Sequence, residues 1–366
     1  MLVVIVDLLV NRGPLPRLRN GAPNRQHHFF RSLPRIFCLL LVSVLLVSCA
    51  QAEASEGPAR KLRVGYLASL THAPAIIGIE KNFFADALGS TQLSTKAFNS
   101  GTEVIEALFS GALDLAFIGP NPALNGFAKS KGKAVVVIAG STNGGAAFIT
   151  RKDITTVDDL RGTTLATPSL GNTQDVALRA WLRAQNLSAS VTGDGDVEIS
   201  PRENADTLNA FREGKIDGAW VPEPWATRLV QEGDGHVFVD ERSLWPNNEF
   251  TTTLLIAHPD FAIHHRPTIL AFLNGLHSAI DLANDHPQEA QKLTNDGIAA
   301  VTSKKISEKV LAKAWQSLSF SIEPNTSSLE ETKNHAVREG FMKDVSLNGF
   351  IDLSFLNEAR SEWKTP

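Results

Sequence analysis

Apolar and polar positions beyond Arg60 follow two alternating periods. Apolar runs of about four to eight residues, typical of buried strands, precede longer stretches whose apolar positions recur with helical spacing. The runs predict strands at 61–68, 91–99, 114–120 and 134–140, separated by helices at 73–88, 101–113 and 122–132. Strands alternating with helices predict βαβ units, a mostly parallel sheet and an α/β fold.

The same alternation begins again after a polar interval at 141–145. It comprises the segment 148–153, a helix near 156–162, strands at 163–168, 197–201 and 216–222, and helices at 173–187 and 205–214. The last third has mostly helical patterns, at 269–285, 287–297, 307–318 and 328–344. The length of 366 residues fits about two domains.

Two segments of these units align with each other at an offset of 103 residues. ALFSGALDLAF at 107–117 and AFREGKIDGAW at 210–220 each read as a helix end, a glycine stop and a strand, and a Pro-x-Pro loop follows both. Any two helix–Gly–strand units share part of this pattern, but the common PNP and PEP loops favour two lobes of like design. Because ligands of open α/β sheets bind beyond the carboxyl ends of the strands, both loops are expected at one cleft.

Four loops between predicted elements are candidates for binding a ligand. They are 69–74, 119–122, 141–145 and 167–175, and they contain Ser, Thr, Asn and Gly but neither Lys nor Arg. In the second loop we expect Asn121 as the N-cap and Pro122 as the first helical residue. Helix N-termini carry free N–H groups and a partial positive charge, so the loops together predict a site for a weakly basic oxyanion. Each loop alone also fits ordinary capping.

Three side chains near these loops have roles that the sequence leaves open. His72 precedes a helix and fits a structural hydrogen bond as well as a ligand contact. Glu223 fits a cap or hinge partner as well as a contact to a cationic end of the ligand. Trp225 fits the wall of a pocket as well as the core.

The N-terminus has the pattern of an export signal. Arg31 and Arg35 precede a 13-residue apolar run at 36–48, which is too short to span a bilayer. LVSC at 46–49 resembles a bacterial lipobox and predicts lipidation of Cys49; a plain secretory signal with a chance cysteine is the alternative. Residues 1–30 fit this poorly, and a misplaced start codon or a long n-region would account for them.

Removal of residues 1–48 changes the charge, because this segment holds six Arg and one Asp. The remaining 29 basic and 38 acidic residues give a net charge of −9, which argues against nucleic acid and anionic membrane surfaces as partners. With Cys38 in the signal and Cys49 lipidated, no disulfide or Cys-based metal site is expected. The sequence has no G-x-x-x-x-G-K-[ST], G-x-S-x-G or H-E-x-x-H motif, and we expect no enzyme activity, metal or cofactor.

Four motifs together resemble one known family. THAPAIIGIEKNFF at 71–84, GALDLAFIGPNPALN at 111–125, TPSLGNTQDVALRAWL at 167–182 and AWVPEPWATRL at 219–229 resemble the substrate-binding lipoproteins of ABC importers for aliphatic sulfonates, nitrate and taurine. The resemblance covers about 60–260 closely and the helical C-terminus more loosely. It implies a monomeric, two-lobed periplasmic-binding-protein (type II) fold with a ligand cleft between the lobes, anchored by lipid at the membrane surface and served by permease and ATPase subunits.

The resemblance also implies a division of the chain and a set of contacts. The chain would cross between lobes near 147–150 and 252–257, after a signal at 1–48 and a linker at 49–59. Lobe one would comprise 60–148 and 255–366, and lobe two 149–254. The implied ligand contacts are Thr71, His72, Asn121, Asn143, Gly144, Gly145, Gly171, Asn172, Thr173, Glu223 and Trp225.

The PEP sequence at 222–224 departs from some family members, so the ligand itself stays open. An aliphatic sulfonate is the first expectation, with hydroxyls and backbone N–H groups on the oxyanion and Trp225 and Phe117 on the alkyl part. Nitrate or bicarbonate would need no apolar wall, and a taurine-like amine would use Glu223. A pyrimidine-precursor binder, a sensor lobe and an enzyme on the same fold are the alternatives in function.

Overall fold

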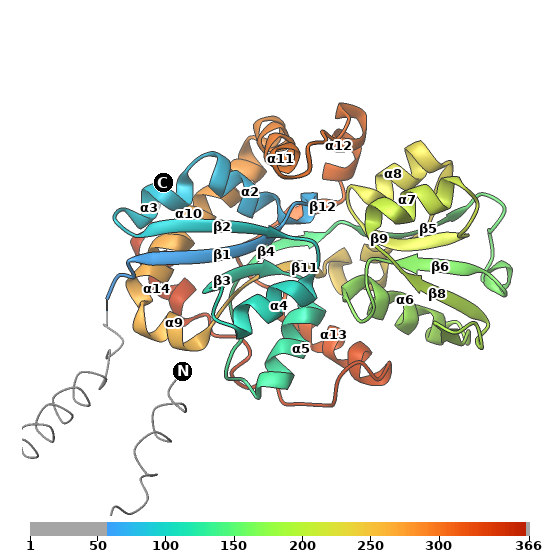
Figure 1. The fold of residues 1–366 in the computed structure, drawn as a ribbon, viewed down its shortest axis with the longest axis horizontal. Helices are drawn as coiled ribbons and strands as arrows, with labels where there is room; N and C mark the ends of the chain where they lie inside the picture. The colour runs from blue at the N-terminus through green and yellow to red at the C-terminus, as the bar shows by residue number, and fades with distance from the viewer. Residues whose placement is uncertain (1–56, 364–366) are drawn as a thin grey trace, which may run out of the picture. The chain divides into compact units, whose positions relative to one another are not determined.

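The computed structural model describes residues 57–363, so the predicted signal, Cys49 and most of the linker lie outside the described residues. Within this range the chain forms two six-stranded sheets flanked by helices (Figure 1). No helix in the described part of the chain is long and apolar enough to cross a membrane. The predicted α/β fold with two sheets is confirmed.

The two sheets contain different parts of the chain. The first has the strand order β12-β4-β11-β3-β1-β2, with β1 (Lys61–Leu67), β2 (Gln92–Phe98), β3 (Leu115–Ile118), β4 (Val136–Gly144), β11 (Thr251–Ala257) and β12 (Leu318–Phe320). The second has the order β10-β5-β9-β6-β8-β7, with β5 (Ala146–Arg151), β6 (Thr164–Thr167), β7 (Ala189–Ser190), β8 (Val197–Pro201), β9 (Gly218–Pro222) and β10 (Gly235–Asp240). We call each sheet with its helices a lobe.

Strand pairing is mixed, which differs from the expected mostly parallel sheets. β1 runs parallel to β2 and β3, and β6 runs parallel to β8 and β9. By contrast, β11 is antiparallel to β3 and β4, and β5 is antiparallel to β9 and β10. β5 and β11 each enter their sheet from the other lobe. They therefore start at the edge where the parallel strands end, and must run the opposite way.

Helices cover both faces of each sheet. On the first sheet, α2 (Ala73–Glu80), α3 (Phe83–Leu88), α10 (Arg266–Asp285), α11 (Pro287–Thr302), α12 (Glu308–Trp315) and α14 (Ser354–Glu362) share one core, and α4 (Gly101–Phe109), α5 (Pro120–Ser130) and α13 (Thr326–Arg338) share the other. On the second, α7 (Asn204–Arg212) and α8 (Trp225–Gly233) pack opposite α6 (Thr173–Ala184). The short α9 (Pro259–His264) precedes α10.

The two lobes repeat one structural unit, as the internal alignment predicted. Asp114 and Asp217 occupy equivalent places before β3 and β9. The Asp114 carboxylate accepts a hydrogen bond from the backbone N–H of Arg63 at 2.8 Å, and that of Asp217 accepts from the backbone N–H of Thr164 at 2.8 Å. Both carboxylates therefore fasten the start of the neighbouring parallel strand, β1 or β6.

The chain passes between the lobes at two places. Gly144 ends β4 and Ala146 begins β5, so the first passage is at Gly145; the second lies between β10 and β11, at 241–250. The predicted lobe boundaries at 148/149 and 254/255 fall inside β5 and β11, each of which belongs to one sheet throughout.

Several local predictions need correction. The helix expected at 73–88 is two helices, because Asn82 between them has a left-handed backbone (φ 58°). The helix near 156–162 is a short 3₁₀ turn at Asp158–Leu160. Most of the polar interval at 141–145 is not a loop: β4 continues to Gly144, because its backbone pairs with β11 on one side and β12 on the other.

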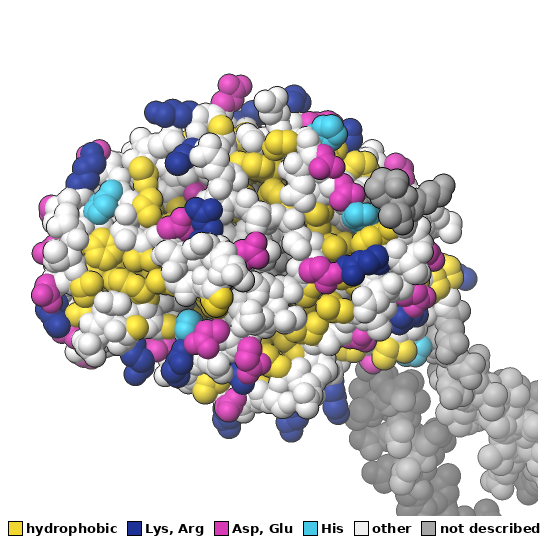
Figure 2. All heavy atoms as spheres, turned by 180° about the vertical axis from the view of Figure 1, so that it is seen from behind, with side chains coloured by type: hydrophobic (Ala, Val, Ile, Leu, Met, Phe, Trp, Pro, Cys, Tyr) yellow, Lys and Arg dark blue, Asp and Glu magenta, His cyan; other side chains and the backbone are white. Residues whose placement is uncertain are grey.

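Charged side chains are interspersed on the face seen in Figure 2, where acidic and basic groups alternate without a block of one sign. This distribution is typical of a solvated surface rather than of a nucleic-acid-binding face.

Candidate functional site

A cleft of about 600 Å³ lies between the lobes, at the carboxyl ends of the parallel strands. The first lobe lines it with the segments after β1 and β2 and with part of the α5 N-terminus. The second lobe lines it with the segments after β6, β8 and β9. The polar lining residues include Ser69, Thr71, His72, Asn99, Ser100, Asn172, Thr173, Gln174, Asn204 and Thr252. The cleft lies where open α/β sheets bind their ligands.

Helix N-termini converge on this cleft. α4 begins at Gly101, α6 at Thr173, α7 at Asn204 and α8 at Trp225, all of which line the cleft, and α2 and α5 begin directly after lining residues. No Lys or Arg is among the described residues that line it. The groups of this lining that can attract an anion are therefore helix dipoles, free backbone N–H groups and neutral polar side chains.

Two carboxylates line the cleft, but both are exposed and belong to helix starts. Glu203 precedes α7. Glu103 lies in the first turn of α4, whose N-cap is Ser100: the Ser100 hydroxyl accepts from the Glu103 backbone N–H, and the Glu103 carboxylate accepts from the N–H of Asn99, just before the N-cap, both at 3.3 Å. Capping therefore accounts for Glu103.

Thr71 and His72 form a buried polar pair on the wall of the first lobe. Thr71 Oγ1 lies 3.2 Å from His72 Nδ1, and the Thr71 carbonyl accepts a hydrogen bond from Thr253 Oγ1 at 2.8 Å. Burial lowers the pKa of His72 to about 3. The imidazole is therefore neutral near pH 7 and presents a dipole rather than a charge.

The loop before α6 is held rigidly by one buried carboxylate. Asp175 accepts hydrogen bonds from the Gly171 backbone N–H at 2.9 Å and from Thr167 Oγ1 at 2.8 Å, and it pairs with Arg179 at 3.1 Å. Asn172 is the N-cap, and its side chain accepts from the Asp175 backbone N–H at 2.9 Å. This network orients the first N–H groups of α6 toward the cleft.

The prediction that Asn121 is the N-cap of α5 is wrong. Gly119 is the N-cap and Pro120 the first helical residue, because proline fits the first turn; Asn121 therefore lies inside the helix. Its backbone N–H is 3.5 Å from Thr173 Oγ1, where the two lobes meet. The Asn121 side chain faces a second, much smaller cavity of about 10 Å³ rather than the cleft.

Asn143 and Gly144 end β4, Gly145 is the passage between the lobes, and none of the three lines the cleft. The Gly144 N–H donates to the Phe250 carbonyl at 2.9 Å, and the Gly145 N–H donates to the Ser317 carbonyl at 2.8 Å. Gly145 has φ 71°, and a Cβ there would come 2.1 Å from a methyl of Leu318. Only glycine fits this position.

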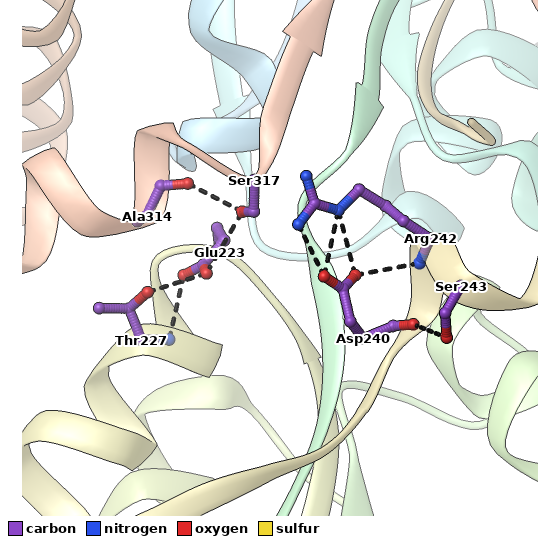
Figure 3. A network of polar contacts seen from close by, with 7 residues as sticks. All are labelled: Glu223, Thr227, Asp240, Arg242, Ser243, Ala314 and Ser317. Carbon is purple, nitrogen blue, oxygen red and sulfur yellow. Dashed lines mark hydrogen bonds and ion pairs between the residues drawn. The ribbon is translucent and has the colours of Figure 1, made fainter. Parts of the chain in front are cut away.

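Glu223 lies behind the cleft, in the network of Figure 3. Its carboxylate accepts from the Thr227 backbone N–H at 3.1 Å and from Thr227 Oγ1 at 2.8 Å, which caps α8. Ser317 Oγ of the first lobe also donates to it, at 3.4 Å. Burial raises the pKa of Glu223. This geometry fits a cap and hinge partner better than a contact to a cationic ligand.

Trp225 lines the cleft at the start of α8. Its indole is half-buried, and the Arg228 guanidinium lies 4.6 Å from the ring centroid. Trp220, by contrast, is a core residue that stacks on Phe148 at 5.6 Å. Phe117, expected near the alkyl part, is fully buried in the core of the first lobe.

The structure thus separates the predicted contacts into two groups. Thr71, His72, Asn172, Thr173 and Trp225 line the cleft, whereas Asn121, Asn143, Gly144, Gly145, Gly171 and Glu223 do not. The segment after β2 was not among the predicted loops, although the S-x-x-E sequence at Ser100, typical of a helix start, was a signal for it. Glu241, a buried carboxylate, was not predicted either, because nothing in its sequence context distinguishes it. No group of His, Cys, Asp and Glu within the described range is suited to hold a metal ion.

The chain belongs to the NMT1-like family, whose model matches residues 55–298. It is 28% identical over 228 residues to the taurine-binding periplasmic protein of Escherichia coli (strain K12), covering 62% of this chain and 67% of that protein. It is 25% identical over 304 residues to the bicarbonate transport ATP-binding protein CmpC of Synechocystis sp., covering 76% of this chain. The chain spans only 44% of that relative's length.

Among solved structures, the fold is similar to that of the alkanesulfonate-binding protein SsuA from Xanthomonas axonopodis pv. citri bound to MOPS. The TM-score is 0.65 at 18% identity, and the match covers 81% of this chain and 99% of that one. At this identity the likeness shows the periplasmic-binding-protein fold.

Proposed function

We propose that this protein is the solute-binding component of an ABC importer, which captures a small oxyanion outside the cytoplasmic membrane and delivers it to a permease. The observation that carries this proposal is the convergence of helix N-termini on a cleft without Lys or Arg among its described lining residues. Dipoles and hydroxyls bind an oxyanion without forming an ion pair, and this suits a ligand that must be released again.

An aliphatic sulfonate fits the cleft best. Its volume of about 600 Å³ is ample for an organic anion, and Leu67, Phe98, Pro122, Trp225 and Val301 supply apolar walls. The sulfonate oxygens would meet Thr71, His72, Asn172 and Thr173, and the alkyl part would meet Trp225. Nitrate and bicarbonate lack an apolar part to contact these walls and are the second candidates.

The other predicted residues would act indirectly. Gly171 and Asn121 would support the ends of α6 and α5, whereas Asn143, Gly144, Gly145 and Glu223 would hold the passage between the lobes. The division between the lobes would lie close to the predicted 60–148 with 255–366 and 149–254, but at the passages, Gly145 and 241–250, rather than inside β5 and β11. Hinge motion at the passages would close the cleft over the ligand and present a closed form to the permease.

The wider setting follows from the N-terminal sequence. Export with lipidation at Cys49 would place a monomer at the membrane surface, beside permease and ATPase subunits. A pyrimidine-precursor binder, a sensor lobe and an enzyme remain the alternatives. The similarity to the taurine-binding periplasmic protein of Escherichia coli, which is named as a binding protein, supports a non-enzymatic role for this chain.

A melting-shift screen of the purified protein tests the proposal. Aliphatic sulfonates should raise the melting temperature in proportion to the logarithm of their concentration, and more than nitrate or bicarbonate does. No shift with sulfonates, taurine, nitrate, bicarbonate, phosphonates or pyrimidine precursors would contradict an oxyanion-binding role.

A further inference from the structure

The small cavity beside Asn121 lies at the junction of the two lobes. Its volume is about 10 Å³, and its walls come from α5, α13 and the start of β11 of the first lobe, from α6 of the second, and from the passage at 241–250. The wall residues that matter here are Asn121, Thr173, Glu241, Trp245, Thr251 and His335. Any change in the separation of the lobes therefore changes this cavity.

Buried polar atoms in this cavity lack partners. Neither atom of the Asn121 side-chain amide has a hydrogen-bond partner among the described residues, and Glu241 Oε1 has none either. Glu241 Oε2 accepts from the Trp220 indole N–H at 2.6 Å. Both Asn121 and Glu241 are 1% exposed. The space is enough for about one water molecule, which would link the amide to the carboxyl group.

The charges around Glu241 do not neutralise a carboxylate. Asp240 precedes it, and Arg242 is already paired with Asp240 at 2.6 Å. His335 of α13 also lines the cavity. Burial lowers the pKa of this imidazole, and its Nε2 lies 3.1 Å from Glu331 Oε1. The lining residues from α5, α6 and β11, like the whole of β9, include no titratable side chain. Glu241 forms no ion pair within the described range, so burial favours its neutral form.

We propose that Glu241 takes up a proton when the two lobes come together, which makes ligand capture tighter at lower pH. This inference rests on the proposed function, because ligand binding is the event that would hold the lobes together. A protonated carboxyl group has an O–H donor for the water or for the Asn121 amide oxygen. An ionised one would remain buried beside Asp240, with the Trp220 and Trp245 indoles as its donors and no cation to pair with among the described residues.

The direction of the pH dependence follows from linkage. Burial raises the pKa of Glu241 to about 7 in this structure, against 4.5 for the free group. Separation of the lobes admits water to the cavity and moves the pKa back toward the free value. Between these two values the open form is ionised and the closed form is protonated. Affinity therefore falls as pH rises, by at most about tenfold per pH unit, and levels off above about pH 7.

The test is calorimetric titration of ethanesulfonate into the full chain at pH values from 5 to 8. The wild type should bind more weakly as pH rises to 7, whereas Glu241→Gln, which mimics the neutral side chain, should change less than twofold. His335→Gln and the exposed control Glu106→Gln should keep the wild-type slope. A slope retained in Glu241→Gln, lost in His335→Gln or absent from the wild type would overturn the inference.

A second readout separates this inference from the proposed function. Small-angle X-ray scattering of the ligand-free protein should show a radius of gyration that increases from pH 5 to pH 8 in the wild type and stays constant in Glu241→Gln. If ethanesulfonate and the other anions fail to bind at any pH, the proposed function fails, and the scattering comparison still decides the role of Glu241. Identical scattering curves for the two proteins would contradict that role.

Discussion

Ser317 Oγ donates a hydrogen bond to Glu223 Oε1 at 3.4 Å, which joins the first lobe to the carboxylate that caps α8 of the second. The backbone of Glu223 adds two more links between the lobes: its N–H donates to the Gly145 carbonyl at 2.8 Å, and its carbonyl accepts from Ser69 Oγ at 3.0 Å. Residue 223 is thus a junction between the cleft loop after β1, the passage at Gly145 and the start of α8.

Glu223→Gln should therefore affect stability more than ligand choice. Loss of one carboxylate oxygen weakens the cap on Thr227, and we expect the free energy of unfolding to fall by about 1 kcal/mol. The ratio of affinities for taurine and ethanesulfonate should stay within twofold, because the carboxylate does not line the cleft. Urea unfolding and calorimetry measure the two quantities. A selective loss of taurine binding would instead place Glu223 on the cationic end of the ligand.

Thr173→Val should weaken anion binding without unfolding the protein. The Thr173 hydroxyl lies on the cleft wall, at the start of α6 and next to the Asn121 backbone N–H. Loss of one hydroxyl to a charged group costs about 1.5–3 kcal/mol, which is at least a tenfold loss of affinity. Thr326→Val, at the exposed start of α13, is the matched control and should bind normally. Equal affinities in the two variants would remove Thr173 from the site.

Trp225→Ala should reduce the dependence of affinity on alkyl chain length. Each methylene buried against an apolar wall contributes about 0.8 kcal/mol, or about fourfold in affinity. The wild type should therefore gain affinity from methanesulfonate to pentanesulfonate, Trp225→Phe should keep most of this gain, and Trp225→Ala should lose most of it. An unchanged gain in Trp225→Ala would mean that the alkyl part lies elsewhere in the cleft.

His72 should make the protein sensitive to acid. Its pKa is about 3 when folded against 6.5 for the free group, so the unfolded chain binds the proton first. The contribution of His72 to the free energy of unfolding is therefore fully present above about pH 6.5. It decreases as pH falls below that value, by at most about 1.4 kcal/mol per pH unit. His72→Gln should therefore lose less stability than the wild type between pH 6.5 and 4, in urea unfolding. The exposed His286→Gln should behave as the wild type does.

Cys49→Ala should release the protein from membranes into the soluble exported fraction, whereas Cys38→Ala should leave it anchored. Fractionation with an antibody against the protein measures both. A wild-type protein that is already soluble would contradict lipidation at Cys49.

The two-lobed fold was predictable because its signals are local and repeated. The helix–Gly–strand pattern placed Asp114 and Asp217 correctly as equivalents, and both carboxylates fasten a neighbouring strand. The strand directions were less predictable, because β5 and β11 look like any apolar run. Only their origin in the other lobe makes them antiparallel.

The candidate site was partly predictable for a similar reason. Thr173 and Asn172 carry a local capping signal, and the structure places them on the cleft wall. Asn121 carries the same signal, yet Pro120 starts its helix earlier and turns its amide into the small cavity. Glu241 had no signal at all, because its environment is assembled from five segments that are distant in the sequence.

The most direct test of the central claim is calorimetric titration of pentanesulfonate into the purified wild-type protein and into Thr173→Val. We expect saturable binding of one ligand per chain in the wild type, with at least tenfold weaker binding in the variant. No measurable binding to the wild type, or equal binding to both proteins, would contradict the assignment of this cleft as a sulfonate site.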